Sequence, residues 1–255
     1  MLNQRQQDIL QRLKRDGYIS TESLADEYAV TTQTIRRTIN DLCERGLARR
    51  QHGGVALLAA NTNKAYAQRK VHNIDAKRAI ARQVVNYLLP ESTVFLGYGS
   101  TVAQVLEVLP KDIALTVITN NLHAVMKLTA FENIETWVAG GKLRTQDQDT
   151  SGFHTTQFIH QFRADIALCG VAAIDEQGAL FEFQPEEAEL TRALLANSQR
   201  KFLLADSTKY QRAANARVAH LSAIDDLFIE KNIPALQHLC QQHQVDIHLG
   251  DSINE

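Results

Sequence analysis

The chain has 255 residues, of which 44% are hydrophobic, and its formal net charge is −2. This length allows one large or two smaller domains with real hydrophobic cores, and the near-neutral charge excludes a polycationic protein. The three cysteines, Cys43, Cys169 and Cys240, are too few and too far apart for a disulfide framework, so we expect a reducing, cytoplasmic setting. We expect no secretory leader and no membrane association, because no apolar run is long enough.

Charge is distributed unevenly along the chain. Residues 1–72 hold 12 Lys and Arg against 7 Asp and Glu, whereas the remainder holds 15 against 22. A basic head and an acidic body suggest one module that faces nucleic acid and a second module with another role. We divide the chain into a head (residues 1–58), a linker (59–74) and a body (75–252).

The head begins with two predicted helices. An apolar stripe predicts a helix over residues 3–15, which Gly17 is suited to end. Ser20 is a good N-cap for a second helix over residues 21–28, and Thr31 can cap a third. Short helices joined by a tight turn predict a helix-turn-helix.

The third predicted helix covers residues 31–42, TTQTIRRTINDL. Its apolar residues, Ile35, Ile39 and Leu42, share one face. The opposite face carries two guanidiniums and two side-chain amides, which can bond to phosphates and to the edges of guanine and adenine in a major groove; these belong to Gln33, Arg36, Arg37 and Asn40. The pattern predicts a DNA recognition helix, and the alternative is an ordinary amphipathic helix with a solvated charged face.

Two short strands, residues 47–51 and 55–58, surround His52-Gly53-Gly54 and predict a hairpin, or wing. Basic side chains on its near strand could clamp backbone phosphates. A winged helix that binds protein instead is the alternative. We expect contacts with double-stranded DNA from Ser20, Thr31, Thr32, Gln33, Thr34, Arg36, Arg37, Asn40, Arg49, Arg50 and His52.

Residues 17–54 resemble the N-terminal domain of DeoR-family bacterial transcription regulators. The most specific parts are Thr34-Ile35-Arg36-Arg37 and Arg50-x-His52-Gly53-Gly54. That family usually has Asp after the two arginines, where this sequence has Thr38. Losing a carboxylate there could change the orientation of the arginines, and so the choice of operator, without affecting the fold.

The linker, residues 59–74, has little apolar periodicity and three cations, Lys64, Arg69 and Lys70. It predicts a solvated connector, and the alternative is a strap that lies on the body. Its charge could add non-specific attraction to DNA.

Apolar runs alternate with helical segments through the body. Strands are predicted at residues 93–96, 115–118, 134–139, 164–169, 201–205 and 227–229. This alternation predicts an α/β fold with a mainly parallel sheet that is covered on both faces. Ligands of such sheets bind beyond the carboxyl ends of the strands.

Polar residues follow several of these strands. Gly99-Ser100-Thr101 opens a helix whose N–H groups suit a phosphate, although the same residues also suit a plain capped turn. Gly141 allows close approach of the backbone. The convergence of these loops predicts a site for a phosphorylated sugar or polyol, formed by Gly99, Ser100, Thr101, Asn120, Asn121, Gly141, Lys142, Arg144, Glu187, Asp206 and Lys209.

The body resembles the DeoR-family effector domain, through motifs that include Gly99-Ser100-Thr101 and Gly140-Gly141-x-Leu143-Arg144. The resemblance implies a winged helix-turn-helix followed by a larger Rossmann-like α/β domain related to ribose-5-phosphate isomerase. Leu180-Phe181-Glu182-Phe183 is most similar to the branch that contains the glycerol-3-phosphate repressor and sulfo-sugar regulators. Gly97 and Thr191 stand where that family usually has Asp and Lys, so the effector could differ or bind more weakly.

We therefore expect a sequence-specific transcription regulator, most naturally a repressor, that works as a homodimer or homotetramer. One alternative is a sugar-phosphate isomerase with an accessory head, although no general base with a matched acid is evident. Another is an architectural DNA-binding protein with an inactive pocket. We expect no catalytic residue, no cofactor and no metal, since His238, Cys240 and His243 lack the further ligands of a tetrahedral site.

Overall fold

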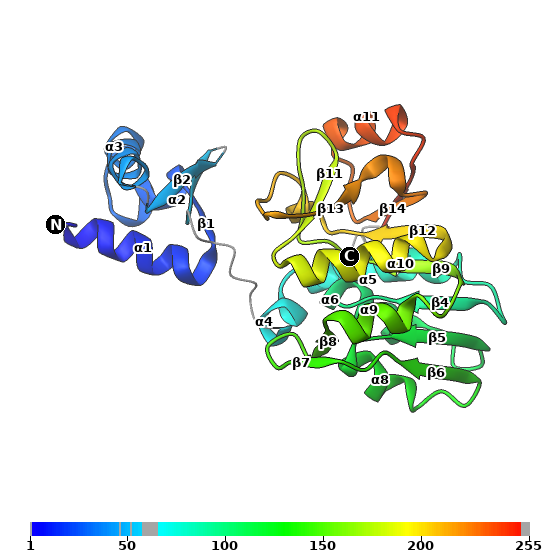
Figure 1. Ribbon diagram of the computed structural model, residues 1–255. Coiled ribbons are helices and arrows are strands. Elements are labelled where there is room, and N and C mark those ends of the chain that lie inside the picture. The colour runs from blue at the N-terminus through cyan, green and yellow to red at the C-terminus, as the bar shows by residue number, and fades with distance from the viewer. Residues whose placement is uncertain (1, 46, 52, 58–65, 251–255) are drawn as a thin grey trace. The chain divides into compact units, whose positions relative to one another are not determined.

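The computed structural model describes residues 2–45, 47–51, 53–57 and 66–250 (Figure 1). The chain divides into two compact units, Met1–Asn63 and Lys64–Glu255. The first unit is built from α1 (Gln4–Asp16), β1 (Tyr18–Ser20), α2 (Thr21–Glu27), α3 (Thr32–Glu44), β2 (Ala48–Gln51) and β3 (Gly54–Leu57).

Caps set the helix boundaries of the first unit close to those predicted. Gly17 ends α1 with a φ of 76°, a value that glycine adopts at little cost. The Ser20 hydroxyl accepts the Ser23 N–H at the start of α2, and the Thr31 hydroxyl accepts the Thr34 N–H at the start of α3. The helices pack around a core that includes Ile9, Leu13, Leu24, Ile35, Ile39 and Leu42.

The wing is a three-stranded antiparallel sheet in the order β1-β3-β2. The sequence predicted β2 and β3 but not the pairing of β1, in which Ser20 lies opposite Gly54. A side chain at Gly54 would overlap the carbonyl oxygen of Ile19, so glycine is required where these strands meet. His52 and residue 58, which the sequence also placed in the wing, lie outside the described residues.

The second unit contains a seven-stranded sheet in which all neighbouring strands are parallel. Its order is β15 (Asp246–Leu249), β14 (Asp226–Ile229), β12 (Ser198–Leu204), β9 (Ala164–Cys169), β4 (Thr93–Leu96), β5 (Leu115–Thr119) and β6 (Ile134–Val138). The prediction of a mainly parallel sheet is confirmed, although β15 was not predicted.

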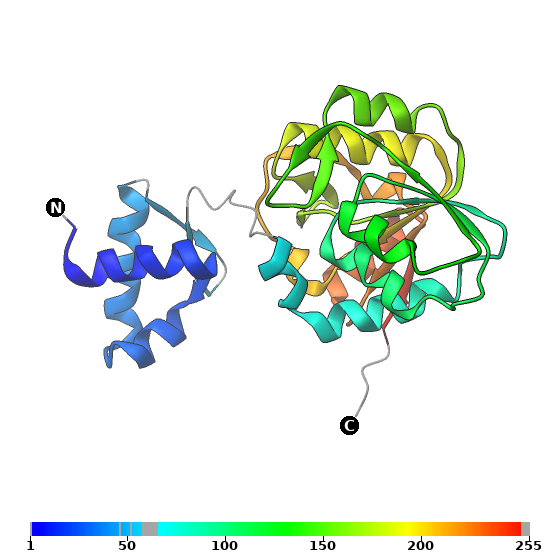
Figure 2. The same ribbon diagram turned by 90° about the horizontal axis from the view of Figure 1, so that it is seen from below.

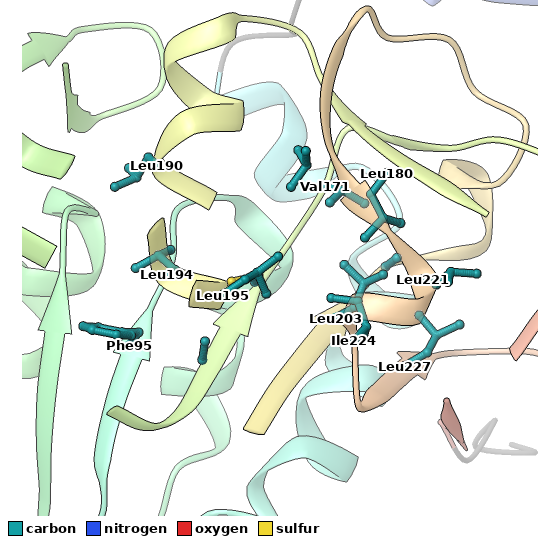
Figure 3. Packing of buried hydrophobic residues seen from close by; sticks show 14 of the residues in the cluster. Phe95, Val171, Leu180, Leu190, Leu194, Leu195, Leu203, Leu221, Ile224 and Leu227 are labelled. Carbon is teal, nitrogen blue, oxygen red and sulfur yellow. The ribbon is translucent and has the colours of Figure 1, made fainter. Parts of the chain in front are cut away.

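Helices cover both faces of this sheet (Figure 2). One core lies between the sheet and α9 (Phe153–Ile159), α10 (Pro185–Ala196) and α11 (Pro234–Gln242). Figure 3 shows part of it, where Leu194 and Leu195 of α10 lie over strand residues such as Phe95. The other core lies under α5 (Ile74–Val85), α6 (Ser100–Ala103), α7 (Val105–Val108) and α8 (Leu122–Leu128).

Short elements complete the second unit, and the sequence had not predicted them. A small antiparallel sheet contains β10 (Ala173–Ile174), β11 (Ala179–Glu182) and β13 (Ala216–His220), with the 3-10 helices η1 (Ser207–Lys209) and η2 (Leu221–Ala223). A separate hairpin pairs β7 (Lys142–Arg144) with β8 (Asp149–Ser151). Within the described ranges, none of the helices combines the length and the hydropathy that a membrane span needs.

Part of the predicted linker packs on the body. Helix α4 (Tyr66–Val71) follows the residues that lie outside the described ranges. Tyr66 is buried, its ring lies 5.2 Å from that of His123 in a tilted arrangement, and its backbone N–H donates to Gln146 O at 2.9 Å. The prediction of a solvated connector is therefore wrong for this part. The Tyr66 ring packs near His123, a contact between distant residues that the local sequence pattern does not indicate.

Candidate DNA-binding surface and effector site

The two-sided character of α3 is as predicted. Ile35, Ile39 and Leu42 are at most 2% exposed. On the opposite face the side chains of Gln33, Arg36 and Arg37 are exposed together with Thr32, and Asn40 is half-buried. The helix therefore anchors itself through aliphatic residues and presents cations and amides to solvent.

Two of the predicted DNA-contacting hydroxyls have structural roles. Those of Ser20 and Thr31 are the caps of α2 and α3, and the Thr34 hydroxyl lies 3.0 Å from that of Thr31. At the position of the family departure, the Thr38 hydroxyl donates to Thr34 O at 3.1 Å. The hydroxyl of Thr38 is thus turned to its own helix.

Arg50 of the wing contacts the exposed face of α3. Arg50 donates from Nε to Asn40 Oδ1 at 2.8 Å and also from Nη2 to the same oxygen. Two residues that the sequence predicted separately as DNA contacts are therefore bonded to each other. Arg49 lies on β2 opposite Ala56 in the register of the wing.

The predicted effector residues that follow β4 and β5 lie at the carboxyl edge of the parallel sheet. Gly99 follows β4 with a φ of 109°, and Ser100 and Thr101 begin α6 as buried residues. Asn120 and Asn121 follow the neighbouring strand β5 and are buried as well. The fold therefore brings these loops to one edge, as parallel topology requires.

Arg144 is the centre of a buried ion-pair cluster. Its Nε and Nη2 donate to the two carboxylate oxygens of Asp149 at 2.7 and 2.6 Å, and its Nη1 donates to Glu187 Oε1. Burial opposes the charge of Arg144, but these two carboxylates raise the pKa of its guanidinium above its usual range. The Tyr98 ring lies under the guanidinium at 5.5 Å.

Sequence reasoning predicted Arg144 and Glu187 but missed Asp149. Asp149 is 1% exposed and lies on β8, a three-residue strand without a local hydrophobic pattern. Its pKa is raised to about 6, chiefly by burial, while Arg144 opposes that shift. A prediction of the β7–β8 hairpin would have identified Asp149, because its antiparallel pairing places Asp149 opposite Arg144.

The side chains of Asn120 and Asn121 differ in their hydrogen bonds. The Asn120 side chain donates to Thr150 O at 2.7 Å and so ties the β7–β8 hairpin to the end of β5. Asn121 caps α8, because its Oδ1 accepts the Ala124 N–H at 3.1 Å. Among the described residues its buried Nδ2 has no hydrogen-bond partner, so this amide is an unsatisfied donor at the end of β5.

A second charged cluster surrounds Asp206 at the end of β12. Asp206 accepts from the Asn73 side chain at 3.3 Å and from the Thr208 N–H and hydroxyl. Burial alone would raise the pKa of Asp206, but Lys209 and these donors hold it below its usual range. Burial lowers the pKa of Lys209 and raises that of Glu182, on β11.

Glu182 links the two clusters. The largest cause of its shifted pKa is burial, followed by the charges of Glu187 on one side and Lys209 on the other. The Tyr98 hydroxyl donates to Glu187 O at 3.0 Å and lies 2.9 Å from the Thr191 hydroxyl. At the family position that usually holds Lys, this chain thus has a neutral residue that orients Tyr98.

Two of the predicted effector residues, Gly141 and Lys142, are not part of these clusters. Gly97, at the position of a family departure, is tightly packed. A side chain at Gly141 would overlap the Thr155 hydroxyl, so this glycine serves packing against α9. Lys142 is exposed at the start of β7. A side chain at Gly97 would lie 2.9 Å from Leu168 O, so the backbone occupies the space of the missing Asp.

Two family models match this chain in the order of its two units. Residues 5–61 match a DeoR-like helix-turn-helix domain, and residues 72–231 match the DeoR C-terminal sensor domain. The chain belongs to the DeoR family. It is therefore a DNA-binding transcriptional regulator with a sensor domain of that family, as the motifs in both units had indicated.

Relatives in the DeoR family match over nearly the whole chain. The glycerol-3-phosphate regulon repressor of Escherichia coli K12 is 34% identical over 96% of this chain and 98% of its own. The transcriptional repressor CsqR of the same organism is 35% identical over 96% and 94%. Ribose-5-phosphate isomerase A of Methanocaldococcus jannaschii is similar over 54% of this chain and 55% of its own, with 19% identity and a TM-score of 0.41. That last similarity is too low to bear on activity.

Proposed function

We propose that this DeoR-family regulator represses an operon for the catabolism of a small carbohydrate or polyol, and that a phosphorylated form of that compound controls its binding to DNA. The main support for effector binding is the set of buried charged groups at one edge of a parallel sheet, centred on Arg144 and Asp206. The name of the glycerol-3-phosphate regulon repressor supports the same class of effector.

The proposed ligand contacts follow from the chemistry of the site. The phosphate would be held by the N–H groups of Ser100 and Thr101, the unpartnered Asn121 amide and the Lys209 ammonium. The Glu187 and Asp206 carboxylates would accept hydrogen bonds from hydroxyl groups of the ligand. Arg144 would hold Glu187 in place and supply positive charge.

The DNA contacts, the oligomeric state and the compartment of the regulator complete its proposed function. The head, residues 1–58, binds double-stranded operator DNA through α3 and the wing, and the body, residues 75–252, binds the effector. The regulator works in the cytoplasm as a homodimer or homotetramer, since one winged head buries too little surface for high specificity. It has no catalytic turnover, and pentose phosphates incubated with it should not isomerise.

Operator affinity and thermal stability in the presence of a panel of phosphorylated sugars and polyols test this proposal. At 100 times its Kd, an effector should stabilise the protein by about 2.7 kcal/mol. The same compound should change operator affinity at least tenfold, which is within the usual coupling range of about 1–3 kcal/mol. The unphosphorylated parent compounds serve as controls. A panel that changes neither quantity would overturn the effector assignment.

A further inference from the structure

The carbonyl oxygen of Asn40 is already occupied in the DNA-binding unit. Arg50 donates two N–H groups to Asn40 Oδ1, one of them at 2.8 Å. A guanidinium has donors only, so the atom that faces it has to be the oxygen of the amide. Both lone pairs of this oxygen are then used, and in the described residues no hydrogen bond involves Asn40 Nδ2.

This arrangement changes what Asn40 can recognise. An asparagine with both ends free pairs with adenine, because its oxygen accepts from adenine N6 and its nitrogen donates to N7. With the oxygen taken, only the two N–H groups remain. Guanine offers two acceptors to them, O6 and N7, whereas adenine offers one acceptor and turns its N6 donor toward another donor.

We propose that Arg50 makes Asn40 a donor-only reader that selects guanine over adenine at the base pair it contacts. Arg50 is then a specificity-determining residue that acts through Asn40 and does not touch that base. The inference rests on the binding of operator DNA by α3. It also gives the wing a second role besides phosphate contact, because β2 supplies the side chain that sets the hydrogen-bonding pattern of α3.

The geometry of the unit supports a stable pair. Arg50 lies opposite Val55 in the paired part of the wing, and Val55 is fully buried. On α3 the residue before Asn40 is Ile39, which is 2% exposed and fixes the helix against the core. The backbones at both ends of the contact therefore belong to packed elements, and a hydrogen bond from a charged donor is stronger than a neutral one.

Selection from a randomised duplex library with the full-length protein and its variants tests the proposal. Asn40→Ala identifies the base pair that Asn40 contacts, because the preference at that pair disappears. At this pair the wild type should prefer guanine over adenine by about 5- to 100-fold. Arg50→Met frees the oxygen and should reverse the preference to adenine. The lost charge weakens binding to both sequences, so the ratio of the two affinities is the quantity to compare.

Arg45→Met is the matched control. Arg45 is an exposed cation at the end of α3 that bonds to Asp41 at 2.9 Å and not to Asn40, so its loss should lower affinity without changing the ratio. The proposal is overturned if the wild type prefers adenine at that pair, if Arg50→Met keeps the wild-type ratio, or if Asn40→Ala changes no position. Failure of the wild type to select any sequence would refute operator binding as well.

Discussion

Arg36 and Arg37 lie on the exposed face of α3, and we expect specific DNA binding to depend on them. Arg36→Ala or Arg37→Ala should weaken operator binding by about 1–3 kcal/mol where a bidentate base contact is lost. Fluorescence anisotropy at fixed salt measures this loss. Arg78→Ala, which removes the same charge from the exposed surface of α5, is the control. Unchanged operator affinity in both arginine variants would count against recognition by this face.

Lys77 is 3% exposed and donates from Nζ to His72 O at 2.7 Å and to Arg69 O, at the end of α4. Burial lowers its pKa from 10.5 to about 8. Between these pH values the unfolded chain binds more protons than the folded one, so the stability that Lys77 contributes rises with pH.

We expect the free energy of unfolding of the wild type, relative to that of Lys77→Met, to increase by about 2 kcal/mol between pH 7 and pH 10. Denaturant titrations across this range measure the difference. Lys77→Arg, whose guanidinium stays charged, should show no such gain. A constant difference between wild type and Lys77→Met would show that the pKa of Lys77 is not lowered.

At the scale of elements, α4 connects the segment after the head to the proposed effector site. Arg69 of α4 pairs with Asp147, which lies 3.5 Å from Arg144 Nη1. Asn73, two residues after α4, bonds to Asp206 in the second cluster. Both charged clusters of the proposed effector site are thus in contact with the segment that leads to the head.

Arg69→Gln should therefore reduce the effect of the effector on operator affinity more than it weakens the binding of effector or of DNA. We expect the ratio of operator affinities with and without effector to fall toward one, while operator affinity without effector stays near the wild-type value. Anisotropy titrations of the operator at saturating effector measure this ratio. Lys70→Gln, the next residue on the same helix, is the control. A wild-type ratio in Arg69→Gln would exclude α4 as the coupling element.

The elements that the sequence pattern did not predict depend on contacts between distant segments. Strand β15 is one of them, since its four residues carry a weak hydrophobic pattern. His248 of β15 bonds to Asp226 at 2.8 Å and to the Tyr87 hydroxyl at 2.9 Å, and Arg200 pairs with the same carboxylate. These partners come from three other parts of the chain, so no local pattern predicts the strand.

At the scale of the whole molecule, the proposed function requires that effector binding in the body changes DNA binding by the head. Thr101 is 6% exposed at the start of α6, where the proposed phosphate would sit. Thr101→Glu should place a carboxylate there and abolish the effect of the effector on operator affinity, while affinity without effector is retained. Thr101→Ser, which keeps the hydroxyl, is the control. An effector response that persists in Thr101→Glu would place the pocket elsewhere.

The sequence by itself determined the two modules, the order of most of their elements and the two-sided α3. These features follow from hydrophobic periodicity and capping residues, which act over a few neighbouring positions. Only the tertiary structure decided that Asp149 joins Arg144 and that Arg50 occupies the oxygen of Asn40. Each of these contacts depends on the exact register of two strands or on the placement of a strand against a helix. Such placement comes from packing of the whole unit, which local patterns do not encode.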